Sequence, residues 1–261
     1  MEFLKASRRK SLLSEALHIA LNAALAAAMF ALVSTGSSFL ALALVLVSKW
    51  RILAVRPRYW WANILANIVD LSVSVSTIVL LYLAGSSAEY GAILQVVIAV
   101  LYALWLIVVK PRSTERWIVY QAGTSLFLGA WAIMALSYTL PQIVTVLSVF
   151  VMAYGAARHV LVVREEDQPS LLAMVFGLFI AEIAWVSYHW TVAYGATVLG
   201  DLKLSQAAII IGLVGFLAIR LYSVAVSGKS LRSVDAVAPA VFVGLVIMVL
   251  ALFFSAGAGI I

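Results

Sequence analysis

The chain has 261 residues, of which 65% are apolar and only 11% are charged, and its mean hydropathy is +1.12. Soluble domains are about half apolar and about a quarter charged, so this composition predicts an integral membrane protein without a separate soluble domain. The absence of cysteine excludes disulfides, thiolate metal sites, iron–sulfur clusters and cysteine nucleophiles. We attribute the net charge of +6 to membrane topology rather than to nucleic acid binding.

Apolar runs separated by short polar, glycine or proline segments predict one all-α transmembrane domain, residues 1–261, with nine spans. The expected spans lie at about 12–34, 38–55, 60–83, 90–109, 117–138, 142–163, 170–194, 204–226 and 236–256. The basic head Met1 to Lys10 is typical of a signal peptide, but the apolar run continues to Val33. That length is enough to cross the membrane, so we expect an uncleaved first helix.

The second span is the least regular of the nine. A helix from Ser38 to Val55 reaches ~27 Å at ~1.5 Å per residue. It crosses the membrane only if Lys49 and Arg51 extend their side chains to the interface. Pro57 disfavours helical geometry at the preceding residue and ends this element.

The positions of the basic residues predict the topology. With the N-terminus in the cytoplasm and a change of side at each span, 16 of the 17 Lys and Arg residues lie at cytoplasmic ends, and only Lys203 lies outside. A re-entrant second run would break this pattern. We therefore expect a multi-pass protein of the cell (cytoplasmic) membrane, with the N-terminus inside and the C-terminus outside.

A polar seam runs along the third span. It consists of five residues at helical spacing: Asn63, Asn67, Asp70, Ser74 and Thr77. Asp70 is the only acidic residue of its span and lies near the membrane midplane. A polar face inside a membrane must contact protein or water, so we expect the bundle to pack around this seam.

Two further polar stripes follow the same spacing. Glu182 lies near the middle of the seventh span, with Trp185 and His189 on the same face, and a third stripe (Glu15, His18, Asn22) lies in the first span. A carboxylate at the midplane must be neutralised, paired or hydrated. We expect the third and seventh spans to pack with their acids towards one shared interior.

Two interpretations of these acids stay open. In the functional one, Asp70 and Glu182 bind protons or a small cation, His189 relays protons, and Asn63 and Asn67 are co-ligands. In the structural one, the acids only hold helices together through hydrogen bonds to Asn, Gln95, Gln121 or Tyr. The functional interpretation predicts that Asp70→Asn preserves folding and removes pH-dependent activity.

Basic residues near the cytoplasmic ends form a second candidate site. Arg158 and Arg220, with Arg56 and Arg58, are candidates for binding an anionic head group, although side chains that reach the interface to fix topology explain them more simply. No closely spaced His, Asp and Glu set predicts a metal, and no phosphate-binding loop or catalytic motif predicts a cofactor or a catalytic residue.

The leading functional hypothesis is therefore a small proton- or cation-coupled transporter or channel-like protein in the lipid bilayer. The alternatives are a structural or accessory subunit that binds other membrane subunits and, third, a lipid-acting membrane enzyme. On balance the sequence argues against an enzyme.

Overall fold

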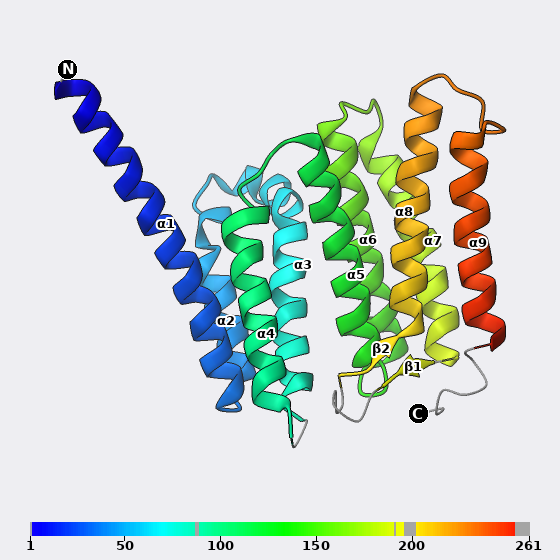
Figure 1. Cartoon of the computed structure of the whole chain (residues 1–261), viewed down its shortest axis with the longest axis horizontal. Helices are drawn as coiled ribbons and strands as arrows, with labels where there is room; N and C mark the ends of the chain where they lie inside the picture. The colour runs from blue at the N-terminus through cyan, green and yellow to red at the C-terminus, as the bar shows by residue number, and fades with distance from the viewer. Residues whose placement is uncertain (1, 87–88, 191, 196–201, 254–261) are drawn as a thin grey trace.

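The computed structural model describes residues 2–86, 89–190, 192–195 and 202–253 and shows an all-α bundle (Figure 1). Its helices are α1 (Glu2–Ser34), α2 (Ser38–Ser48), α3 (Trp60–Ala84), α4 (Gly91–Leu104), α5 (Glu115–Ala135), α6 (Gln142–Val163), α7 (Pro169–His189), α8 (Gln206–Val226) and α9 (Val234–Phe253). A π-helical turn, Trp105–Val109, extends α4.

Eight helices in the described part of the chain are long and apolar enough to cross a membrane. Their bounds follow the expected spans closely, and α6 occupies residues 142–163 as predicted. Pro57 and Pro169 lie in the first turns of their helices, where a missing backbone N–H costs no hydrogen bond. The chain is thus an integral multi-pass membrane protein.

The prediction of one helix across the second span is wrong in its length. α2 ends at Ser48 after 11 residues, a length of ~16 Å at ~1.5 Å per residue. The backbone continues through short 3-10 turns at Trp50–Ile52 and Pro57–Tyr59 instead of one helix to Val55. The next residue, Lys49, caps the helix, and its side chain turns into the bundle rather than reaching the interface as expected.

The seventh expected span is too long at its C-terminal end. α7 ends at His189, and the chain then forms a two-stranded antiparallel ladder between β1 (Ala193–Tyr194) and β2 (Leu204–Ser205). Trp131 of α5 donates a hydrogen bond from Nε1 to the Lys203 carbonyl at 2.8 Å. This bond fixes the β1–β2 hairpin against the end of α5.

Successive helices run in opposite directions (Figure 1). The connections α2–α3, α4–α5, α6–α7 and α8–α9 lie at the end of the molecule where the N-terminus lies, and the other connections lie at the opposite end. The basic connections therefore share one end, as the charge pattern predicts. That this end faces the cytoplasm stays a prediction.

Most of the helices pack into two groups that meet along α3. Buried apolar residues of α1 to α4 form one core, and those of α5 to α8 form another. The groups meet where α3 packs on small residues. A Cβ atom built on Gly155 of α6 falls 2.2 Å from Ile68 Cγ2, and one built on Gly129 of α5 falls 3.2 Å from Ser72 Oγ. These two glycines let α5 and α6 approach α3 closely.

Candidate functional sites

Asp70 forms the centre of a charged cluster with two lysines. Its Oδ2 atom accepts hydrogen bonds from Lys49, which follows α2, and from Lys110, which follows the π-helical turn, at 2.8 Å for Lys110. The Asp70 side chain is only 14% exposed and that of Lys49 9%, whereas that of Lys110 is 39% exposed. Two lysines therefore share the one carboxylate, and Asp70 ties α3 to the ends of α2 and α4.

The other seam residues mostly bond to nearby backbone. Asn67 Nδ2 donates to the Asn63 carbonyl at 2.8 Å, and Asn63 Nδ2 donates to the Ile52 carbonyl at 3.4 Å. Ser74 Oγ donates to the Asp70 carbonyl and accepts a bond from Tyr102 at 3.0 Å. The structure places neither asparagine in contact with the Asp70 carboxylate, so their expected role as co-ligands stays a prediction.

Two buried polar atoms near this cluster have no hydrogen-bond partner among the described residues. They are Asp70 Oδ1 and Trp105 Nε1, and Trp105 begins the π-helical turn that leads to Lys110. π-helical turns occur frequently at functional sites, and unpaired buried polar groups are uncommon. Gln95 and Gln121, considered as partners for the acids, instead donate to the backbone carbonyls of Leu81 and of Val109 and Arg112.

The expectation of a shared interior for Asp70 and Glu182 is wrong. Glu182 is exposed on the outer face of α7, and Asp70 lies against α2 and α4. His189 is also exposed, and its Nε2 lies 2.9 Å from Gln142 Nε2. Helical spacing correctly grouped Glu182 with His189 on one face, but that face points away from the bundle.

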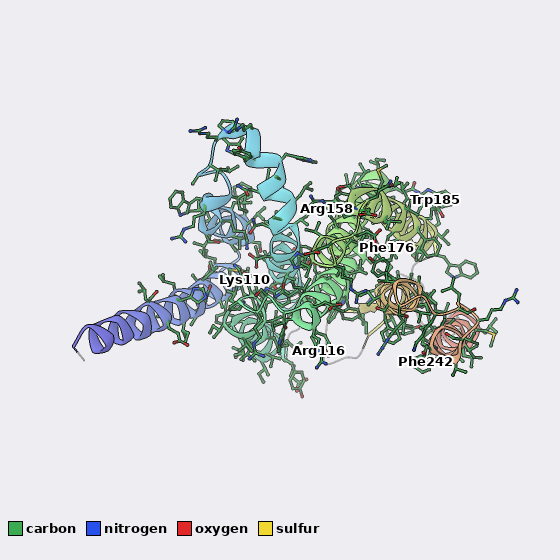
Figure 2. The ribbon with its side chains drawn as sticks, turned by 90° about the horizontal axis from the view of Figure 1, so that it is seen from above. Lys110, Arg116, Arg158, Phe176, Trp185 and Phe242 are labelled. Carbon is green, nitrogen blue, oxygen red and sulfur yellow. The ribbon has the colours of Figure 1, made fainter. Side chains whose placement is uncertain are left out.

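The four arginines proposed for an anionic head group do not form one pocket. Arg56 and Arg58 are exposed near the start of α3, and the Arg58 guanidinium lies 4.6 Å from the centre of the Tyr59 ring. Arg158 lies between α3 and α6 (Figure 2), and its buried Nε has no partner among the described residues. Arg220 is exposed on α8, 5.3 Å from the Phe216 ring.

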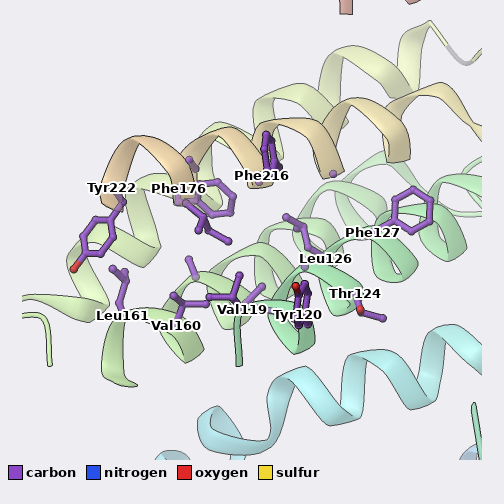
Figure 3. Close-up of a pocket in the computed structure, with 18 of the residues that line it drawn as sticks. Val119, Tyr120, Thr124, Leu126, Phe127, Val160, Leu161, Phe176, Phe216 and Tyr222 are labelled. Atoms are coloured by element: carbon purple, nitrogen blue, oxygen red, sulfur yellow. The ribbon is translucent and has the colours of Figure 1, made fainter. Parts of the chain in front are cut away.

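A large apolar groove, which the sequence did not predict, lies between α5, α6, α7 and α8 (Figure 3). Its volume is about 620 Å³, within the ~300–1,000 Å³ typical of ligand sites. Small residues leave the space: Ala122, Gly123, Ala156, Ala157, Gly212, Gly215 and Ala218. Larger apolar side chains, among them Phe127, Phe176 and Phe216, form its walls.

The groove opens sideways towards lipid. Tyr120 of α5 and Phe216 of α8 both line it, and they are 63% and 43% exposed. Between Gly212 and Tyr222 the groove extends for ~15 Å along α8 at ~1.5 Å per residue. It is therefore a long apolar slot within the transmembrane region.

Charged and polar groups gather where the groove meets the basic end of the molecule. Arg164 lines the groove, donates from Nε to Glu115 at 2.9 Å and donates from Nη1 to Ser223 at 3.1 Å. Tyr222, which also lines it, donates a hydrogen bond to the Glu166 carboxylate. We call Arg164, Glu115, Tyr222 and Glu166 the mouth of the groove.

The sequence signal for the groove is the set of small residues. Gly215 is a site of close helix packing, because a Cβ there falls 2.7 Å from Leu126 Cδ2. Gly123 is different, because a Cβ there meets no atom within 4 Å. Glycines that allow packing and a glycine that lines an open space look alike in a sequence.

Within the residues that the structure describes, no three His, Asp or Glu side chains gather as a metal site. No protein-family model matches the chain, and no curated protein or solved structure is similar to it. The chain's own residues establish an integral multi-pass membrane protein.

Proposed function

We propose that this protein binds the hydrocarbon chain of a membrane lipid or isoprenoid in the groove between α5 and α8. The observation that carries the proposal is the shape and chemistry of that groove, a slot of about 620 Å³ lined by 21 residues, of which only Tyr120, Thr124, Arg164 and Tyr222 have polar side chains. An apolar slot that is open to the bilayer and polar at one end matches an amphiphile with a chain and a head group.

The mouth favours a head group at the basic end of the molecule. Arg164 supplies a guanidinium and Tyr222 supplies a hydroxyl, but the carboxylates Glu115 and Glu166 outnumber the one cation of the mouth itself, so the excess of positive charge at this end comes from nearby arginines. Arg116 and Arg220 lie one turn beyond the groove-lining residues Tyr120 and Phe216 at the same end. Arginine pairs well with phosphate and carboxylate oxygens, so these residues suit an anionic or zwitterionic head group.

The groove supports binding rather than catalysis. Among the described residues that line it, the polar side chains are two tyrosines, a threonine and an arginine, and the two carboxylates at its mouth, Glu115 and Glu166, already accept hydrogen bonds from Arg164 and Tyr222 rather than pointing a free base at the groove. The groove thus resembles a site that holds or presents a lipid more than one that cleaves it. Its location in a cell membrane with the mouth towards the cytoplasm is part of the same proposal.

Proton- or cation-coupled transport is a second proposal, supported by one observation. Asp70 Oδ1 is buried without a partner among the described residues, next to the partly exposed Lys110. A carboxylate with a free oxygen beside a partly exposed lysine could exchange partners during a transport cycle. The two lysines also explain the charge of Asp70 structurally, which is why we place transport second.

Photo-crosslinking tests the lipid proposal. The full chain is reconstituted with lipids that carry a diazirine near the end of one chain, and the labelled peptides are identified by mass spectrometry. We expect label to concentrate on 119–128 of α5 and 212–222 of α8, relative to the exposed apolar helix α9. Labelling in proportion to exposed apolar area on all helices would contradict a specific groove.

The same diazirine-bearing chain, attached in turn to a free fatty acid, a phospholipid and a polyprenyl phosphate, identifies the class of head group that the groove prefers. We expect the phosphate-bearing lipids to label the groove more strongly than the fatty acid, because Arg164 can form paired hydrogen bonds to phosphate.

A further inference from the structure

Glu182 lies near the middle of a membrane-spanning helix. It is three residues beyond the centre of α7 (Pro169–His189), or ~5 Å along the helix axis. Its neighbours on the helix surface are apolar. We call the exposed residues Leu178, Phe179, Glu182, Trp185 and Val186 the outer face of α7.

Within the described part of the chain, the residues of this face are exposed. Glu182 has no hydrogen-bond or ion-pair partner there, and Trp185 is 53% exposed and lies at the outer edge of the molecule (Figure 2). His189 lies two turns away and engages Gln142, with the Trp185 ring in edge-to-face contact with it. No basic residue of α7 therefore neutralises Glu182.

A carboxylate exposed to hydrocarbon is unstable without a partner. Transfer of an ionised side chain to the middle of a bilayer is costly, and acidic residues within spans normally pair with other groups. Lysine and arginine can reach the interface with long side chains, whereas the glutamate side chain is too short to leave the midplane region. The position of Glu182 therefore calls for a complementary group from outside the described chain.

A second copy of this chain does not supply that group on the same face. Two copies inserted in the same orientation place both Glu182 side chains at the same depth, so contact through the outer faces of α7 brings like charges together. The other residues of this face are apolar and offer no cation. A membrane helix with a basic residue at mid-span satisfies both the charge and the depth.

We propose that the outer face of α7 binds a transmembrane helix of another protein that carries a lysine or arginine near its middle. Leu178, Phe179, Trp185 and Val186 provide the packing surface, and Glu182 provides the ion pair. This makes the chain a subunit of a membrane assembly. The inference does not depend on the lipid groove, which is lined by none of the residues of the outer face of α7.

The test uses defined helices rather than an unidentified partner. The full chain and a synthetic polyleucine helix of about 21 residues are reconstituted in liposomes, and association is measured by energy transfer. Three helices differ only in their central residue, which is lysine, glutamine or leucine. A central residue stays at the midplane in either orientation, so the direction of peptide insertion does not affect the test.

We expect the lysine helix to associate at least tenfold more strongly than the leucine helix. Glu182→Gln and Glu182→Leu should reduce this ratio to about one, whereas Glu89→Gln, which removes an exposed carboxylate at the α3–α4 connection, should leave it unchanged. Because Glu182 is exposed and has no hydrogen-bond or ion-pair partner among the described residues, both variants should keep the thermal stability of the natural chain.

Three outcomes would overturn the proposal. The first is equal association of the lysine and leucine helices. The second is a preference for lysine that survives Glu182→Leu. The third is Glu182-dependent self-association of the chain without any peptide, which would assign the face to a second copy.

Discussion

At the level of single residues, two carboxylates inside membrane-spanning helices have different surroundings in this molecule. Asp70 and Glu182 both lie inside long apolar helices, at the spacing expected for polar faces. Asp70 is enclosed and shared by Lys49 and Lys110, whereas Glu182 points outwards. Helical periodicity shows which residues share a face, but the direction of that face depends on neighbouring helices that the local sequence does not specify.

The lysine pair changes the expected effect of neutralising Asp70. With Asp70→Asn, Lys49 keeps its charge in a site where its side chain is 9% exposed, and loss of one partner of a buried pair costs ~3–5 kcal/mol. We therefore expect Asp70→Asn to destabilise the protein by ~3 kcal/mol in reversible unfolding in mixed micelles, rather than to preserve folding as the sequence suggested.

Matched variants separate the charge from the loss of contacts. Lys110→Met should cost less, ~1 kcal/mol, because Lys110 is 39% exposed and partly solvated. The double variant Lys49→Met with Asp70→Leu should recover most of the loss, since apolar replacement of a buried pair is often neutral. Unfolding of Asp70→Asn at the same midpoint as the natural chain would show that the ion pair contributes nothing.

At the level of elements, most helices could be predicted and the irregular segments could not. Long apolar runs with proline or glycine boundaries fixed α3, α5, α6 and α8 to within a few residues. α2 was predicted too long because its end depends on Lys49 meeting Asp70, a contact between separate helices. The β1–β2 hairpin was missed because residues up to 194 continue the apolar composition of α7.

The groove is also a property of several elements together. Its small residues come from α5, α6 and α8, and none of these helices carries a sequence signal for a cavity by itself. A Cβ on Gly155 would meet Ile68 of α3, and one on Gly129 would meet Met152 of α6 and Ser72 of α3, whereas a Cβ on Gly123 meets no atom within 4 Å. α3 packs on one side of α5 and α6, and the groove lies on the side of these helices that faces α7 and α8.

At the scale of the whole molecule, the alternation of helices and the basic end define a testable topology. The natural chain lacks cysteine, so each single substitution introduces one thiol for membrane-impermeant labelling of intact cells. Thr35→Cys and Thr139→Cys should react from outside, and Ala54→Cys and Ser113→Cys only after permeabilisation, because the positive-inside rule predicts that the basic connections face the cytoplasm. All four positions are exposed.

Thiol labelling at Thr35 and Ala54 tests the topology of α2 in particular. These residues flank α2, and their labelling from opposite sides would show that the short helix and the following 3-10 turns together cross the membrane. Labelling of both residues from the same side would mean that α2 does not cross the membrane. The N-terminus would then lie on the side opposite to the expected one relative to the rest of the bundle, which would contradict the nine-pass topology.

The central claim is that the groove between α5 and α8 retains a lipid, and native mass spectrometry of the purified protein after delipidation tests it most directly. Gly123→Phe places a ring in the groove at a position where a Cβ meets no atom within 4 Å, and Gly244→Phe makes the same change on α9, away from the groove. We expect the natural chain and Gly244→Phe to retain one lipid and Gly123→Phe to lose at least ~90% of it, a tenfold change that corresponds to ~1.4 kcal/mol, with all three equally stable to heat. Equal lipid retention by Gly123→Phe and Gly244→Phe would contradict the account.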